Sequence, residues 1–160
     1  LNFICTHNSR RSHLAQIWAQ TMACYFNIDQ LFCFSGGTEA TALYPSIKDT
    51  LERQGFEFEI SSAGKNPHHH LLFSDDAPAI VAFSKKYDAP FNPSSNFAAI
   101  ITCSHADENC PMIVGAEKRI LMSYEDPKKY DNSSQEIEGY AACSIQIACE
   151  MYHVFSAINK

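Results

Sequence analysis

The chain alternates short runs of apolar residues with longer segments in which apolar and polar residues are mixed. A continuous apolar run of about four to eight residues is typical of a strand that is buried on both faces. Such runs predict buried strands at residues 1–5, 31–35, 79–83, 97–103 and 119–122. Residues 56–60 alternate apolar and acidic side chains, which predicts a half-buried strand or an extended link.

Residues 11–27, 45–54 and 134–158 space their apolar side chains three and four positions apart, as amphipathic helices do. Pro45 lies in the first turn of the second segment and Gly55 lies just beyond its end, and both are typical of helix boundaries. In the last segment we expect one face to be buried, made of Ile137, Ala141, Ile145, Ala148, Tyr152 and Phe155.

Strands that alternate with helices predict an α/β fold with a four-stranded parallel sheet and helices on both faces. A chain of 160 residues without a linker fits one domain spanning residues 1–160. Residues 61–78 are the least structured stretch by composition. The three consecutive histidines at 68–70 are expected in an exposed loop, with metal binding as the alternative.

Charge and hydropathy narrow the range of partners. Lys and Arg number 12 against 18 Asp and Glu, for a net charge of −6, which argues against nucleic acid and anionic membranes as partners. A small anion is not excluded, because a nest of amides and arginines can hold it locally. No apolar run approaches the ~20 residues of a membrane helix, and no signal-peptide pattern is visible. We therefore expect a cytoplasmic location.

Seven cysteines, an odd number in a chain long enough to bury a core, favour reduced thiols over a disulfide framework. Four of them lie in apolar contexts and are expected in the core: Cys24, Cys33, Cys143 and Cys149. Cys103, His105 and Cys110 were considered as metal ligands, but no second pair at zinc spacing follows them. We predict neither a metal nor another cofactor.

The central feature is the segment Cys5–Ser12, a C-x5-R-S sequence between a predicted strand and a predicted helix. Loop amides and the first amides of the helix form an anion site, and the same field favours the thiolate of Cys5 as a nucleophile. Arg11 is expected to bind two anion oxygens through its planar fork, Ser12 to hydrogen-bond the thiolate, and Asn8 to brace the loop. The predicted oxyanion-binding residues are Thr6, His7, Asn8, Ser9, Arg10, Arg11 and Ser12.

This loop resembles that of the low-molecular-weight protein tyrosine phosphatases and the thioredoxin-coupled arsenate reductases. The resemblance spans nearly the whole chain and implies a flavodoxin-like three-layer sandwich (phosphotyrosine protein phosphatase I-like). Three further segments are similar to family motifs: residues 35–38 to a Ser-Ala-Gly segment, Asp126-Pro127 to the Asp-Pro of the general acid, and residues 103–111 to the redox segment of the reductases. The departures are His7 where the family commonly has Gly, Arg10 where reductases often have Cys, and the long connection at 61–96.

The resemblance implies two mechanisms on one site. In a phosphatase, Cys5 attacks phosphorus, and Asp126 protonates the leaving oxygen and then activates water. In a reductase, Cys5 attacks arsenate, Cys103 displaces the arsenic as arsenite, Cys110 takes over the disulfide, and thioredoxin reduces it. The three-thiol layout favours the arsenate reductase, with the phosphatase as the alternative. A binding module without catalysis is disfavoured, because nucleophile, arginine and acid are all present.

Overall fold

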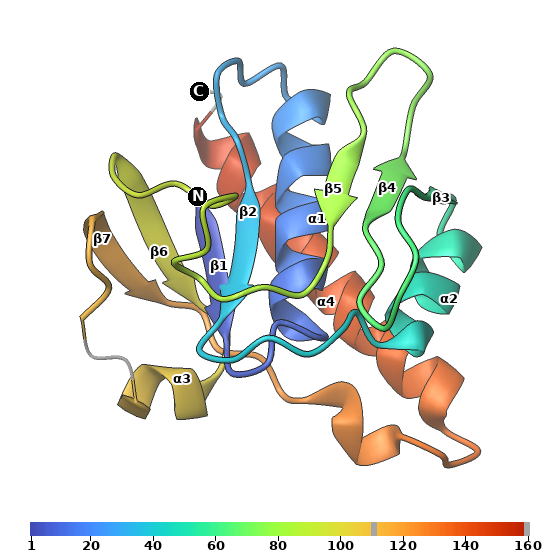
Figure 1. The fold of residues 1–160 in the computed structure, drawn as a ribbon. Coiled ribbons are helices and arrows are strands. Elements are labelled where there is room, and N and C mark those ends of the chain that lie inside the picture. The colour runs from blue at the N-terminus through green and yellow to red at the C-terminus, as the bar shows by residue number, and fades with distance from the viewer. Residues whose placement is uncertain (110–111, 159–160) are drawn as a thin grey trace.

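A computed structural model describes residues 1–109 and 112–158. Its centre is a parallel sheet of four strands in the order β2-β1-β6-β7 (Figure 1). The predicted α/β fold with a four-stranded parallel sheet is confirmed. The strands are β1 (Asn2–Cys5), β2 (Phe34–Gly37), β6 (Phe97–Ile101) and β7 (Ala116–Leu121).

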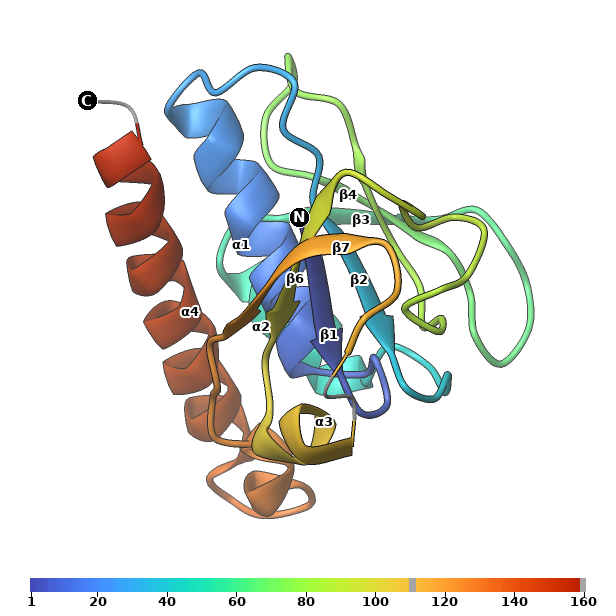
Figure 2. The ribbon, with the colours of Figure 1, turned by 90° about the vertical axis from the view of Figure 1, so that its left-hand side faces the viewer.

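The long helices α1 (Arg11–Tyr25) and α4 (Glu136–Ile158) lie side by side on one face of this sheet (Figure 2). Helix α2 (Pro45–Arg53) packs against α4 on the same side, and the short helix α3 (Ser104–Asn109) contacts β1 and β6. A 3-10 helix, η1 (Pro127–Tyr130), leads into α4. No helix in the described ranges combines the length and apolar character needed to cross a bilayer.

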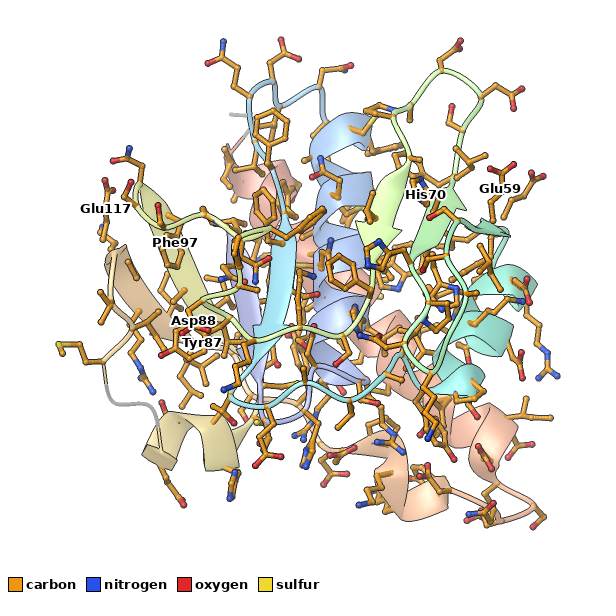
Figure 3. The ribbon with its side chains drawn as sticks, viewed as in Figure 1. Glu59, His70, Tyr87, Asp88, Phe97 and Glu117 are labelled. Atoms are coloured by element: carbon orange, nitrogen blue, oxygen red, sulfur yellow. The ribbon has the colours of Figure 1, made fainter. Side chains whose placement is uncertain are left out.

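Alternate residues of the central strands point to opposite faces of the sheet, as the pleat requires. Phe3 and Ile100 join the larger apolar cluster with α1 and α4. Ile4 and Ile101 join a second cluster on the other face, which also contains Cys5 and Cys103. Tyr87 and Phe97, labelled in Figure 3, belong to this second cluster. The two thiols expected to react are therefore buried in the same apolar cluster.

A second sheet lies beside the first and was not predicted. It is antiparallel, in the order β3-β4-β5, with β3 (Glu57–Ile60), β4 (His69–Leu72) and β5 (Ile80–Ala82). The expectation that residues 61–78 are the least structured stretch is wrong for β4. Antiparallel pairing with β3 and β5 satisfies its backbone polar groups, although its composition is a poor strand signal.

The histidine run at 68–70 was expected in an exposed loop, and this is wrong for His69 and His70, which begin strand β4. His69 is buried and its ring meets Phe58 edge to face, whereas His70 is half-buried and lies opposite Glu59 in the β3–β4 register (Figure 3). His68 stacks on Phe83 with 3.9 Å between the ring centroids.

The predicted inner face of α4 is also wrong in most positions. Ile137 and Ile145 are 58% and 55% exposed. The buried positions are Gly139, Tyr140, Ser144, Ile147, Met151 and Phe155. Ser144 is buried because it accepts a hydrogen bond from Trp18 Nε1 (2.9 Å) and donates one to Gln54 Oε1 (2.7 Å).

The four cysteines expected in the core have different environments. Cys33 is buried and Cys143 is partly buried, whereas Cys24 and Cys149 are exposed. The expectation was therefore wrong for Cys24 and Cys149, because both helices that carry them have apolar residues on more than one side, so the pattern alone did not mark the exposed positions.

Candidate active site

Cys5 ends strand β1 and is only 4% exposed. Its Sγ lies 3.1 Å from Ser12 Oγ and accepts a hydrogen bond from the Asn8 backbone amide at 3.2 Å. The Asn8 amide is a donor to the sulfur, and in the contact with Ser12 either atom can be the donor. The sequence-predicted contact between Ser12 and the sulfur is thus present in the structure.

The loop carbonyls are turned outward and bound by neighbouring segments. Because the C=O and N–H of a trans peptide point in opposite directions, outward carbonyls turn the following amides inward. The Asn8 amide on Cys5 Sγ is one such case. The hydrogen bonds to these carbonyls are donated by Thr38 N to Cys5 O (3.1 Å), by Glu39 N to Thr6 O (2.8 Å), by Ser84 Oγ to His7 O (3.0 Å) and by Tyr44 N to Ser9 O (3.1 Å).

Asn8 is fully buried at the turn of this loop, with φ of 44°. An asparagine tolerates this left-handed conformation better than most residues. Its Nδ2 donates to Ser12 Oγ (2.9 Å), and its Oδ1 accepts from the Lys85 amide (2.9 Å). Asn8 therefore joins the two ends of the loop and ties them to the segment after β5.

Two glycines at the end of β2 allow this close packing. A Cβ on Gly36 would lie 2.3 Å from the Tyr87 Cα, and one on Gly37 would lie 2.7 Å from the Thr6 carbonyl oxygen. Larger residues here would push the neighbouring backbone away. The strand predicted at residues 31–35 is displaced along the chain, since β2 includes Gly36 and Gly37, which give the loop room.

Arg11 and Asp126 meet across the site from distant parts of the chain. Arg11 Nη2 donates to Asp126 Oδ2 at 2.5 Å, and Arg11 Nη1 donates to the Tyr124 carbonyl at 3.0 Å. Asp126 also caps η1 by accepting from the Lys128 amide (3.0 Å). The Arg11 side chain is 14% exposed and that of Asp126 39%. Both face a common pocket, as an anion-binding arginine and a proton donor require.

The Arg10 side chain binds residues that lie outside the loop. Its Nε donates to Tyr140 Oη and its Nη2 to Asp131 Oδ2, each at 2.6 Å, while its guanidinium lies 3.8 Å from the centre of the Tyr44 ring. Burial, then the hydrogen bond to Asp131, raises the pKa of Tyr140, so its hydroxyl keeps the proton that it donates to Asp131. Arg10 thus ties the loop to the chain that follows Asp126.

Cys103 follows β6 at the same edge of the sheet and is 1% exposed. Its Sγ lies 3.5 Å from Thr6 Oγ1 and accepts from the Ala106 amide at 3.4 Å. The structure therefore brings a second buried thiol into contact with the first residue after Cys5. The third predicted thiol, Cys110, lies outside the described residues.

The loop opens into a pocket of about 350 Å³, and Cys5 lines a small hollow of about 20 Å³ that shares most of its walls. His7 stands at the mouth, half-exposed, with Nε2 3.7 Å from Glu39 Oε2. Among the described residues, no phenylalanine, tyrosine, tryptophan or aliphatic side chain lines the larger pocket. Its lining residues are Thr6, His7, Ser9, Arg10, Arg11, Thr41, His105, Asp126 and Lys128.

A buried polar layer behind the loop was missed by sequence reasoning. His13 is fully buried, with Nδ1 3.3 Å from Ser35 Oγ, and burial and then the charge of Lys85 lower its pKa to about 3. Lys85 is 4% exposed, and burial lowers its pKa to about 8. Its ammonium lies near the Phe83 ring and carbonyl. In the sequence, the buried layer is indicated by His13, a histidine that lies among apolar positions of the predicted helix.

The chain is similar in sequence to arsenate reductases. It is 25% identical to arsenate reductase 2 of Staphylococcus epidermidis over 125 residues, covering 78% of this chain and 76% of that protein. It is 22% identical to the arsenate reductase of Halalkalibacterium halodurans over 134 residues, covering 84% and 78%. No protein-family model matches the chain.

Solved structures share the fold. The arsenate reductase of Archaeoglobus fulgidus has a TM-score of 0.63 at 17% identity and covers 97% of this chain and 98% of its own. A low-molecular-weight phosphotyrosine phosphatase of Vibrio cholerae O395 scores 0.65 at 12% identity, covering 99% and 95%. The YwlE arginine phosphatase of Geobacillus stearothermophilus scores 0.63 at 15% identity, covering 98% and 90%.

The predicted resemblance to the low-molecular-weight phosphatase superfamily, with similarity to its arsenate reductases, is confirmed. The sequence similarity points to the reductases, whereas the structural similarity shows the fold that reductases and phosphatases share. The distinction between the two activities depends on the site itself.

Proposed function

We propose that this protein reduces arsenate to arsenite through a thiol relay, with Cys5, Arg11, Asp126, Cys103 and Cys110 as catalytic residues. The observation that carries the proposal is the buried Cys103, which contacts the anion loop through Thr6. A phosphatase needs a single cysteine, whereas a reductase needs a second thiol close to the first. The sequence similarity to arsenate reductases supports the same choice.

The first step would join arsenate to Cys5. Inward amides and Arg11 hold the anion, for which Arg11 exchanges its contact with Asp126 for the anion oxygens. Cys5 Sγ forms a bond to arsenic, the bond from arsenic to its hydroxyl group breaks, and the departing hydroxyl takes a proton from Asp126 and leaves as water. Cys5 attacks as the thiolate, which is the nucleophilic form, and Ser12 and the Asn8 amide contact its sulfur.

The second step would transfer two electrons. The Cys103 thiolate attacks Cys5 Sγ, so that a disulfide forms and the sulfur–arsenic bond breaks with its electron pair on arsenic. Arsenic is thereby reduced from As(V) to As(III), the two sulfurs are oxidised, and arsenite leaves. Cys110 then attacks Cys103 and frees Cys5. We propose thioredoxin as the dithiol that reduces the Cys103–Cys110 disulfide, and the cytoplasm, where thiols are kept reduced, as the location.

The alternative function is hydrolysis of phosphomonoesters through a phosphocysteine on Cys5. The Arg11–Asp126 pair at the pocket favours it, because it supplies the anion clamp and the proton donor that this chemistry uses. Phosphotyrosine is a poor fit, because the pocket walls formed by the described residues contain no phenylalanine, tyrosine, tryptophan or aliphatic side chain. Tyr130 lies against Gly139, and Tyr44 lies under Arg10.

The test measures arsenate-dependent NADPH oxidation with thioredoxin and thioredoxin reductase, beside hydrolysis of p-nitrophenyl phosphate. We expect coupled oxidation that is lost in Cys103→Ser and unchanged in Cys24→Ser, which alters an exposed thiol on α1. Oxidation that survives Cys103→Ser would refute the relay. Hydrolysis without coupled oxidation would establish the phosphatase.

A further inference from the structure

His105 lies on the other side of the hydroxyl that contacts Cys103. Thr6 Oγ1 is 3.1 Å from His105 Nδ1 and 3.5 Å from Cys103 Sγ, so one hydroxyl bridges an imidazole and a thiol. Cys103 is 1% exposed and Thr6 is half-buried, whereas His105 is exposed at the pocket wall. The three groups therefore form a chain of hydrogen-bonding atoms that leads from a buried sulfur to solvent.

A buried thiol that must become a nucleophile needs a route for its proton, because the thiolate is the reactive form. When the thiol is protonated, Cys103 S–H donates to Thr6 Oγ1 and Thr6 O–H donates to His105 Nδ1. When the proton has moved, His105 Nδ1–H donates to Thr6 and the Thr6 hydroxyl donates to the sulfur. Both states keep the two contacts of the Thr6 hydroxyl, and the thiolate also keeps the Ala106 amide.

We propose that His105, acting through Thr6, accepts the proton of Cys103 and so activates this thiol for its attack on Cys5. The Cys103 sulfur–hydrogen bond breaks, the Thr6 hydroxyl passes a proton on, and a nitrogen–hydrogen bond forms at His105 Nδ1. The exposed imidazolium then returns its proton to water. The role in arsenate reduction rests on the proposed function. His105 is a positioning residue, since it reaches the reacting sulfur only through Thr6.

The charges around His105 come from three directions. The loop supplies His7, Arg10 and Arg11, and the chain before α4 supplies Asp126 and Lys128, all at the same pocket. On α3 itself, Asp107 is paired with Arg119 of β7. Among the side chains that share the pocket, His105 is the imidazole within hydrogen-bonding distance of Thr6. An imidazole, unlike arginine or lysine, gives and takes protons near neutral pH.

The test follows alkylation of Cys103 by iodoacetamide as a function of pH, with peptide mapping by mass spectrometry and without arsenate. His105→Asn keeps a side-chain oxygen that can accept from Thr6 but cannot take up a proton. We expect the alkylation rate of Cys103 near pH 7 to fall by about tenfold to a hundredfold. The rates should converge at high pH, where hydroxide removes the proton. The matched control, His153→Gln, alters an exposed histidine of α4 and should leave the profile unchanged.

Variants of Thr6 test the bridge. Thr6→Val removes the hydroxyl and should slow Cys103 alkylation as much as His105→Asn, whereas Thr6→Ser restores the hydroxyl and should restore the rate. The double variant His105→Asn with Thr6→Val should lose no more than either alone, because both interrupt one chain. Circular dichroism checks that each variant is folded. The proposal would be overturned by a Cys103 alkylation profile that is identical in wild type and His105→Asn. It would also be overturned if the double variant lost the sum of the two single losses in alkylation rate.

The two proposals fail separately. If the protein does not reduce arsenate but Cys103 alkylation depends on His105, the proposed function is wrong and the proton route stands. If arsenate is reduced and His105→Asn leaves the Cys103 profile unchanged, the relay stands and the proton route is overturned.

Discussion

The two sides of the site are held in different ways. The Cys5 side is a loop whose carbonyls accept hydrogen bonds from residues 38–44 and from Ser84, with Asn8 buried at its centre. The Asp126 side reaches the loop through side chains, chiefly the ion pairs Arg11–Asp126 and Arg10–Asp131. Backbone hydrogen bonds and buried polar side chains hold the loop of the proposed nucleophile, whereas the proposed acid depends on long side chains for its position. Changes on the acid side should therefore alter the rate of catalysis, and changes on the loop side should alter stability.

The largest effect is expected for Asp126→Ala. It removes the proton donor and should lower kcat for arsenate reduction, or for p-nitrophenyl phosphate hydrolysis, by about two to four orders of magnitude. Urea unfolding should change little, because Asp126 is 39% exposed at its side chain. The control is Glu125→Ala, which changes the exposed neighbour paired with Lys129. An Asp126 variant with undiminished kcat would remove this residue from the mechanism.

The loop side is tested by Asn8→Ala. The change leaves the buried Lys85 amide without its acceptor and places alanine at a positive φ. We expect the free energy of unfolding in urea to fall by about 2–4 kcal/mol. Asn8→Gly also removes the side-chain hydrogen bonds, but glycine adopts the positive φ without strain. Its free energy of unfolding should therefore be about 1 kcal/mol higher than that of Asn8→Ala. Equal stability of the two variants would mean that backbone strain at residue 8 is unimportant.

A smaller effect is expected for Arg10→Lys, which loses the bidentate contact with Asp131 and Tyr140. The segment carrying Asp126 should loosen, and kcat should fall by about tenfold, as displacement of a positioned acid predicts. Alkylation of Cys5 should keep its wild-type rate, because the loop backbone does not depend on this side chain. Arg53→Lys, on the exposed end of α2, is the matched control. Loss of Cys5 reactivity in Arg10→Lys would show that the two sides are not independent.

The smallest effect concerns pH. The pKa of buried His13 is lowered to about 3, while an unfolded histidine titrates near 6.5. Between these values the unfolded chain binds more protons than the folded one, so stability falls as pH drops below about 6.5, by about 1.4 kcal/mol per pH unit. His13→Asn should flatten this dependence in urea titrations between pH 4 and 7. The same slope in the variant would assign acid sensitivity to other groups.

Local motifs were recoverable from sequence because their parts are neighbours in the chain. Cys5, Asn8 and Ser12 come together within one strand–loop–helix unit, so the predicted contact of Ser12 with the sulfur appears at 3.1 Å. The parallel sheet followed from apolar runs that only burial on both faces explains. The side-chain partners of Arg10 and Thr6 lie about 130 and 100 residues away, and no pattern marked them.

The sequence by itself determined the parallel sheet and the strand–loop–helix segment that carries Cys5 and Arg11, because apolar periodicity and the order of neighbouring residues are local properties. The candidates Asp126 and Cys103 came from the resemblance to a known family. Only the tertiary structure decided that residues 57–82 form a second sheet, that α4 buries Tyr140 and Ser144 in place of Ile137 and Ile145, and that Thr6 joins His105 to Cys103. A helix apolar on several sides has no preferred inner face until neighbours such as Trp18 bind one of them. Strand pairing and side-chain bridges likewise depend on which distant segments the fold brings together.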